Sequence, residues 1–370
     1  MRKPRLAAIE YIRGIAMLGV IGIHVGSVYS EIPAANIHMV ALLEIMTRFS
    51  VPIFFFISAF GLFYNLDLQE KFHYVHFLRR RFRAVLIPYL TWSFFYLLLD
   101  STVHHTAFPD GITLLYILFF GTAKYHIYFL VILLWFYVFM PLWMGLIRHL
   151  GKSSLALLFC LQLAFNYASS TILWNVQPEN PLFNELLTYR LNYWVLHYLF
   201  IFVLGGWLAT HFTDFQDFLQ RQYHKIALFF FLSMATMLFS YYQPLLQEGI
   251  TAMEAAEGAH QLTPIGGIYT VAASVFFFAL FSRPCGTTMQ WLLSFLGRHS
   301  YFIYLGHPVA IHLLTAVLQR LGIPLDVPVT AALYLGVLAI TAITAVFCRW
   351  LGCRLPLVNF LMLGLLPAKK

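Results

Sequence analysis

Apolar runs of about 20 residues recur along this chain of 370 residues from one end to the other. Each run is long enough for a helix to cross a hydrocarbon core of about 30 Å. Helices suit such a crossing because they pair their backbone polar groups within the segment. The composition agrees, since 61% of the residues are hydrophobic and 10% are charged, against about 25% charged in ordinary soluble domains. The sequence therefore predicts an all-α, polytopic transmembrane helical bundle.

We expect about ten spanning helices joined by short loops. They cover approximately residues 6–28, 38–66, 83–100, 125–147, 154–172, 189–210, 225–242, 264–281, 291–317 and 328–350. The run 112–121 is too short to span, which predicts one re-entrant or interfacial helix. Residues 1–355 are expected to form a single transmembrane domain, and residues 356–370 a short cytoplasmic tail.

Lys and Arg residues gather in the loops on one side of this predicted topology. Only Lys124, Arg190 and Arg320 fall on the other side. Because short cytoplasmic loops carry an excess of Lys and Arg, the pattern predicts a multi-pass protein with both termini in the cytoplasm. The net charge of +8 is thus explained by topology. The basic residues also lack the aromatic interleaving of a strand-binding groove, so no nucleic-acid partner is expected.

The first apolar run contains two ionisable residues, Arg13 and His24. Eleven residues make about three helical turns, so both side chains lie on one face, about 16 Å apart along the axis. Ionisable groups inside a spanning helix usually face a bundle interior or a water-filled cavity. The alternative is an arginine that reaches the headgroups and a histidine satisfied by a neighbouring helix. The topology places Arg13 near the inner end of its helix and His24 in the outer half.

Three other polar features allow more than one interpretation. The basic segment 71–83 is either a cytoplasmic topology anchor or a phosphate clamp. Glu44 and Arg48 have the spacing of an ion pair within one helix, and Arg48 also lies deep enough to face a cavity. The histidines are dispersed and the cysteines form no Cys-x-x-Cys motif, so no metal site is expected.

Several stretches in order resemble one family. Arg13 and His24 match the Arg-x10-His signature of the acyltransferase-3 family, and Glu10 stands where that family has an acidic residue. Residues 51–58 are similar to its Phe-Phe-x-x-Ser pattern, with Ala59 in place of the usual glycine. The basic run 79–83 with Pro88, the aromatic segment 125–130 with Tyr128 in place of tryptophan, and residues 296–307 also agree. The resemblance covers nearly the whole chain, and intercellular-adhesin-like members are the most similar.

This resemblance implies a membrane O-acyltransferase that moves an acyl group, acetyl or succinyl, from cytoplasmic acyl-CoA to a hydroxyl of a cell-surface or envelope carbohydrate. It implies a bacterial cytoplasmic membrane, no tightly bound cofactor, and polysaccharide-biosynthesis proteins as further partners. His24 is the expected general base, and Arg13 is the second expected catalytic residue. The expected ligands of the donor phosphates are Arg13, Arg79, Arg80, Arg83 and Arg298. The expected substrate-binding or oxyanion-stabilising residues are Arg48, Tyr125, His126, Tyr301, Tyr304 and His307.

Two other classes of function remain open on the sequence. In an exporter or flippase of a surface polysaccharide, Arg13, His24 and Arg48 would line a conduit and perform no chemistry. In a membrane scaffold, the buried charges would have no role, although such charges are functional by default. Loss of acylation with retained export, on removal of His24, would distinguish the enzyme from the exporter.

Overall fold

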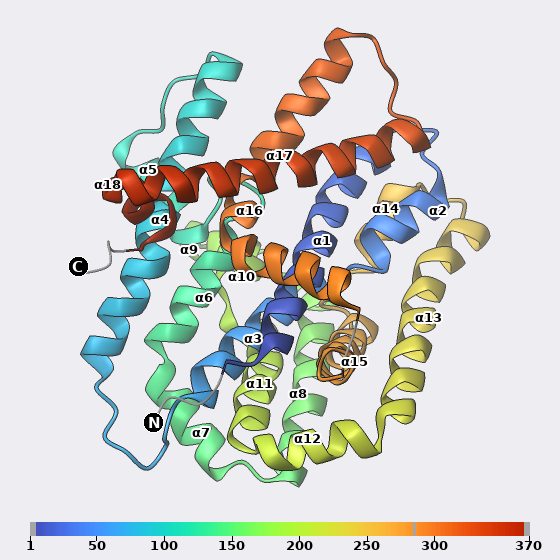
Figure 1. Cartoon of the computed structure of the whole chain (residues 1–370). Coiled ribbons are helices and arrows are strands. Elements are labelled where there is room, and N and C mark those ends of the chain that lie inside the picture. Colours follow the sequence, from blue (N-terminus) through green and yellow to red (C-terminus); the bar gives the residue numbers. More distant parts are fainter. Residues whose placement is uncertain (1–4, 284–285, 366–370) are drawn as a thin grey trace. The chain divides into compact units, whose positions relative to one another are not determined.

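The computed structural model describes residues 5–283 and 286–365 (Figure 1). All regular elements of these residues are helices, which confirms the all-α prediction. The chain divides into two compact units. The first comprises residues 1–66, 153–170 and 200–345, and the second comprises residues 67–152, 171–199 and 346–370.

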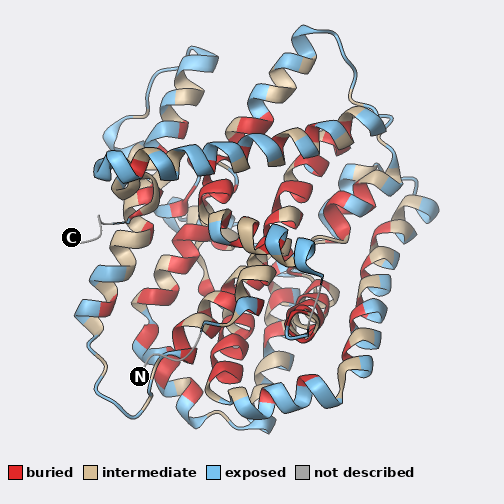
Figure 2. Ribbon diagram, in the orientation of Figure 1, coloured by how far each residue is buried: buried red, intermediate tan, exposed pale blue. Residues whose placement is uncertain are grey.

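The first unit is built around α1. Its elements are α1 (Ala7–Ser30), α2 (Ile37–Val40), the π-helix η1 (Ala41–Ile45), α3 (Ser50–Tyr64), α8 (Lys152–Thr171), α11 (Leu199–Thr210), α12 (Phe212–Arg221), α13 (Tyr223–Gln247), α14 (Ala252–Gly258), α15 (Pro264–Phe281), α16 (Thr287–Arg320) and most of α17 (Val327–Arg354). α1 packs most extensively against α16, and also contacts α3, η1 and α15. Figure 2 shows many buried residues on α1, α3 and α11, where the core of this unit lies.

The second unit contains α4 (Tyr74–His104), α5 (Gly111–Phe120), α6 (Tyr128–Val138), α7 (Met140–His149), η2 (Leu173–Asn175), α9 (Pro181–Thr188), α10 (Arg190–Tyr193), η3 (Val195–Tyr198) and α18 (Pro356–Leu363). α4 packs against α6 and α18. α5 corresponds to the short helix predicted at 112–121 and begins at Asp110, whose side chain accepts a hydrogen bond from the Thr113 amide. Within the predicted tail, residues 356–363 form α18, and residues 366–370 lie outside the described residues.

The expected number of about ten spans is not confirmed. Among the described residues, seven single helices are long and apolar enough to span a membrane. Two bent pairs raise the number to nine if each is one span: α6 with α7, bent by 66°, and η3 and α11 with α12, bent by 98°.

The expected span at 154–172 corresponds to α8, which is not among these candidates. It buries three polar residues, Gln162, Asn166 and Ser169. The Gln162 amide donates to Asn166 Oδ1 at 2.8 Å and accepts from the Phe200 amide at 2.9 Å. These polar side chains lower the hydropathy of α8, yet they are satisfied inside the protein, as a polar group within a membrane bundle must be.

Candidate active site

A close crossing between α1 and α16 positions the candidate site. A Cβ atom added to Gly14 would collide with the Leu293 carbonyl oxygen, and one added to Gly297 would collide with the Glu10 carbonyl oxygen. Only glycine allows the two backbones to approach so closely. Ser294 also donates a hydrogen bond to the Glu10 carboxylate at 2.9 Å. The crossing therefore fixes both the distance and the register of the two helices.

The same two helices bring a pair of histidines together beyond the crossing. Gly14 precedes His24 by ten residues, and Gly297 precedes His307 by ten residues. Ten residues advance each helix by about 15 Å from its glycine. The centroids of the two imidazole rings lie 5.0 Å apart, with ring planes inclined by 23°. The structure thus places His24 and His307, from segments far apart in the sequence, against one another.

The environments of the two rings differ. His307 is fully buried, at 0% exposure, whereas His24 is half-buried. Nδ1 of His307 lies 2.7 Å from the carbonyl oxygen of Tyr304, one turn earlier on α16. His24 is thus the more accessible member of the pair, and the buried His307 ring packs against it.

Arg13 and Arg298 lie near the crossing of the same two helices. Arg13 precedes His24 by eleven residues and Arg298 precedes His307 by nine, which is about 16 Å and 14 Å along the respective helices. Arg13 is half-buried, and Arg298 is exposed. Two cationic residues thus lie at one end of the helix pair, with the histidines further along it.

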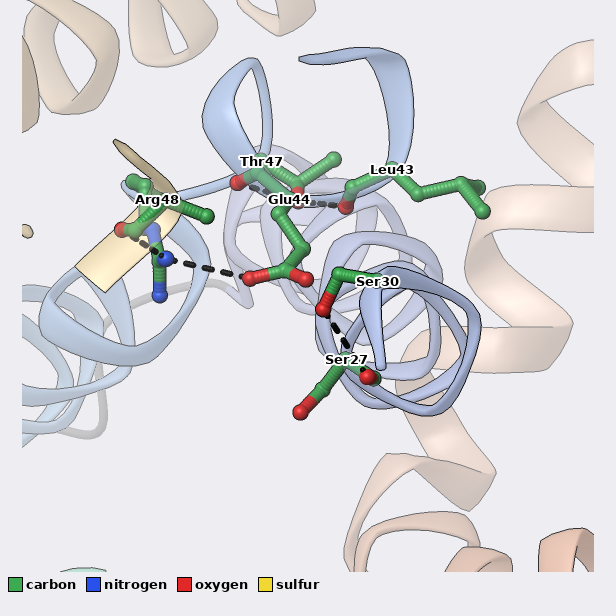
Figure 3. A network of polar contacts seen from close by, with 7 residues as sticks. Ser27, Ser30, Leu43, Glu44, Thr47 and Arg48 are labelled. Atoms are coloured by element: carbon green, nitrogen blue, oxygen red, sulfur yellow. Dashed lines mark hydrogen bonds and ion pairs between the residues drawn. The ribbon is translucent and has the colours of Figure 1, made fainter. Parts of the chain in front are cut away.

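Arg48 is held in a polar network with Glu44 (Figure 3). Its Nη2 lies 3.1 Å from Oε2 of Glu44 and donates to the Ala256 carbonyl oxygen at 2.6 Å. Arg48 and Glu44 are 8% and 4% exposed, so this is a buried ion pair, as their spacing predicted. Arg48 lies close enough to His24 for its charge to act on the imidazole ring. Arg48 therefore belongs to the electrostatic surroundings of the histidine pair.

A break in the second apolar segment allows this network to form. η1 is a π-helix that carries Glu44, and the α-helix resumes only at Ser50. Such π-turns often occur at functional sites. The Tyr269 hydroxyl on α15 donates to the Met46 carbonyl oxygen within the break, at 2.7 Å. Gly26 on α1 leaves room for the Glu44 side chain, because a Cβ there would lie 2.7 Å from Cγ of Glu44.

The carbonyl that binds Arg48 belongs to α14, a short helix between candidate spans. A capping box begins this helix: the Thr251 side chain accepts from the Glu254 amide, and the Glu254 carboxylate accepts from the Thr251 amide at 2.8 Å. These hydrogen bonds from Thr251 lower the pKa of Glu254 below its ordinary value. The cap thus holds an ionised carboxylate at neutral pH and fixes the start of the helix that carries Ala256.

The remaining predicted site residues of the first unit lie on α16. Tyr304 is buried, and its ring centroid lies 6.1 Å from that of His307. Tyr301 is half-buried and lies one turn earlier. Both hydroxyls therefore belong to the helix that carries His307.

The other predicted site residues belong to the second unit. Arg79 and Arg80 are exposed on α4, and Arg83 is half-buried. Their neighbour Arg81 lies over the rings of Phe77 and Tyr137, 5.6 Å from each centroid. Arg81 is thus a packing residue within the basic cluster, which the sequence alone did not separate from the others.

Tyr125 and His126 precede α6 in the second unit. His126 is 2% exposed, and its ring meets the Tyr96 ring edge-on with centroids 5.5 Å apart. Nearby, Lys124 and Asp100 form an ion pair at 2.9 Å. The structure thus gathers the predicted residues into two groups, one around His24 and one on α4 and before α6.

Two groups near His24 were not among the predicted site residues. The only sequence feature that pointed to Glu44 was its spacing of four residues from Arg48, which suits an ion pair within one helix. The Ala256 carbonyl had none, because every residue carries a backbone carbonyl. Among the described residues, no group of three or more His, Cys, Asp or Glu side chains is placed to hold a metal ion.

The fold and this site define a polytopic helical membrane protein with a histidine pair between α1 and α16 and a buried arginine beside it. The family model described as an acyltransferase domain matches residues 6–349, nearly the whole chain. The chain therefore belongs to the acyltransferase-3 family and is a membrane acyltransferase. No curated protein and no solved structure matched it.

Proposed function

We propose that this protein transfers an acyl group, acetyl or succinyl, from cytoplasmic acyl-CoA to a hydroxyl of a cell-surface or envelope carbohydrate. The pairing of half-buried His24 with buried His307 is the observation that carries the proposal. Histidine is the side chain that most often takes and gives a proton in enzyme reactions. Membership of the acyltransferase-3 family supports the reaction class.

In the proposed step, the sugar hydroxyl oxygen attacks the thioester carbonyl carbon while His24 takes the hydroxyl proton. The C–S bond then breaks and the carbonyl re-forms as an ester. The coenzyme A thiolate leaves and receives the proton from His24, which returns to its neutral form. His24 thus acts as base and then as acid, and no covalent acyl-enzyme is needed.

Arg13 and Arg298 are the proposed ligands of the donor phosphates, because arginine binds phosphate oxygens through two parallel hydrogen bonds. An extended donor that reaches from these arginines along the helix pair would bring its thioester to His24. Arg79, Arg80 and Arg83, and the substrate contacts of Tyr125 and His126, stay predictions for the second unit.

Arg48, Tyr301 and Tyr304 are the proposed groups for the negative charge that develops on the thioester oxygen. Preorganised donors aimed at such a charge usually make the largest contribution to catalysis. The Glu44 ion pair and the Ala256 carbonyl hold Arg48 in advance, which supports its assignment. The proposed location is a bacterial cytoplasmic membrane with both termini in the cytoplasm, where polysaccharide-biosynthesis proteins would supply the acceptor.

The first prediction concerns His24→Ala in oriented membrane vesicles. Acetyl-CoA with a labelled acetyl group is supplied at the cytoplasmic face, and label on outer-face glycan is measured. Because removal of a general base costs about 10²- to 10⁴-fold in rate, the label should fall to background in an equally abundant variant.

His312→Ala is the matched control for the histidine chemistry, since His312 is exposed on α16. This variant should transfer label as the wild type does. Absence of label in the wild type, together with glycan crossing that depends on the protein, would favour an exporter and overturn the enzyme proposal.

A further inference from the structure

α16 contains a proline, Pro308, directly after His307. Proline has no backbone N–H, so the carbonyl four residues earlier loses the helical hydrogen bond that it would otherwise accept. That carbonyl belongs to Tyr304. Because a buried backbone carbonyl is costly to leave unsatisfied, it requires another donor.

His307 supplies that donor. Its Nδ1 lies 2.7 Å from the Tyr304 carbonyl oxygen, and its side chain is fully buried. A carbonyl oxygen only accepts hydrogen bonds, so Nδ1 must carry the hydrogen. A neutral imidazole has a single N–H, and therefore Nε2 of His307 is a hydrogen-bond acceptor.

This tautomer limits what His307 can do beside His24. A neutral His307 has used its one N–H on Tyr304 and has none to offer the oxyanion. An acceptor next to a histidine base instead stabilises the positive charge that the base gains on taking a proton, as the third member of a catalytic triad does. The two rings are stacked with their centroids 5.0 Å apart, so this stabilisation is electrostatic and acts across the stack.

We propose that Pro308 is a positioning residue for acyl transfer: by releasing the Tyr304 carbonyl, it fixes His307 as the Nδ1–H tautomer, an acceptor that stabilises protonated His24. The catalytic part of this proposal rests on the proposed function, whereas the tautomer does not. Pro308 and the Tyr304 carbonyl act only through His307.

Nitrogen NMR of protein labelled with ¹⁵N-histidine in lipid nanodiscs tests the tautomer directly. The His307 signal is identified by its loss in His307→Gln. We expect it at the shifts of an Nδ1–H imidazole in the wild type. In Pro308→Ala, the new amide of residue 308 competes for the Tyr304 carbonyl, and part of the signal should move to the Nε2–H form. An Nε2–H signal in the wild type would overturn the proposal without any requirement for activity.

Kinetics of Pro308→Ala test the catalytic consequence. Since one hydrogen bond contributes about 1 kcal/mol, kcat should fall about fivefold to tenfold while the KM for acyl-CoA changes less than about twofold. Pro244→Ala on α13 is the matched control, because Pro244 is also inside a helix of the first unit, away from the histidine pair.

The two measurements separate the two proposals. Unchanged kcat in Pro308→Ala with a shifted tautomer would overturn the positioning role. Equal losses in Pro308→Ala and Pro244→Ala would also overturn it, because they would indicate a general effect of helix straightening. A wild type that transfers no acyl group would refute the proposed function, and the NMR result would still decide the tautomer.

Discussion

Arg48 and Glu44 form a buried ion pair at the break in the second apolar segment, where Glu44 lies within η1. Breaking a buried pair by removal of one partner costs about 3 to 5 kcal/mol, because the remaining charge is left uncompensated. Replacing both partners with apolar residues is often neutral for stability. The pair therefore offers a way to separate a structural role of Arg48 from a catalytic one.

The second prediction uses this difference. Glu44→Leu should lower the thermal unfolding temperature and acyl transfer together, because Arg48 loses its counter-charge. The double variant Glu44→Leu, Arg48→Met should regain most of the stability and should remain at least about tenfold less active, if Arg48 stabilises the oxyanion. Thermal unfolding and initial rates in detergent measure the two effects. Recovery of both properties in the double variant would make Arg48 a structural residue.

At the residue scale, the sequence identified individual candidate site residues, but it did not identify the residues that they contact. Arg13 and His24 were found because two charges in an apolar helix fall on one face. The pairing of His24 with His307 depended on the register of α1 and α16, which is set by backbone contacts at Gly14 and Gly297. Backbone partners such as Ala256 and Tyr304 carry no side-chain signal, so their roles followed only from coordinates.

Helices α1 and α16 pack with their backbones in contact because Gly14 and Gly297 have no side chain at the crossing. The third prediction is that Gly297→Ala lowers acyl transfer by about 10²-fold, since a displacement of about 1 Å between catalytic groups has that effect. Its added Cβ would collide with the Glu10 carbonyl and separate the helices. Overpacking should also cost about 1 to 3 kcal/mol of stability. Initial rates and thermal unfolding measure both.

Gly61→Ala on α3 is the matched control for Gly297→Ala. Gly61 also lies inside a helix of the first unit, but a Cβ there would meet no atom within 4 Å. Replacement of this glycine by alanine should leave activity unchanged and raise stability by less than about 1 kcal/mol through helix propensity. If Gly297→Ala were as active as Gly61→Ala, the crossing would not position the histidines.

At the element scale, the sequence predicted which segments are helical and where they lie, but it could not predict their interruptions. The segment 38–66 was expected as one helix, whereas the chain forms α2, η1 and α3 with a break before Ser50. An apolar run has the same hydropathy whether its helix is continuous or broken. The break depends on tertiary partners such as Tyr269, which satisfies the Met46 carbonyl.

At the scale of the whole molecule, the path of the chain through the membrane depends on α8. With each bent pair as one span, the candidates within residues 5–283 and 286–365 number nine, and nine crossings would place the termini on opposite sides. If α8 also crosses, both termini lie on one side, as the distribution of Lys and Arg predicts. Its 20 residues extend about 30 Å, enough for a crossing, and its buried amides are paired inside the protein.

The last prediction is therefore that α8 spans the bilayer. Lys152→Cys and Glu179→Cys, each introduced into a chain whose native cysteines are replaced by serine, put exposed thiols at the start of this helix and after its end. An impermeant maleimide added to intact cells should label residue 179 and spare residue 152, and permeabilised cells should show both. Because the basic residues around position 152 favour the cytoplasm, the opposite labelling would reverse the topology. Equal access for both positions from one side would make α8 a non-spanning helix, and the termini would then lie on opposite faces of the membrane.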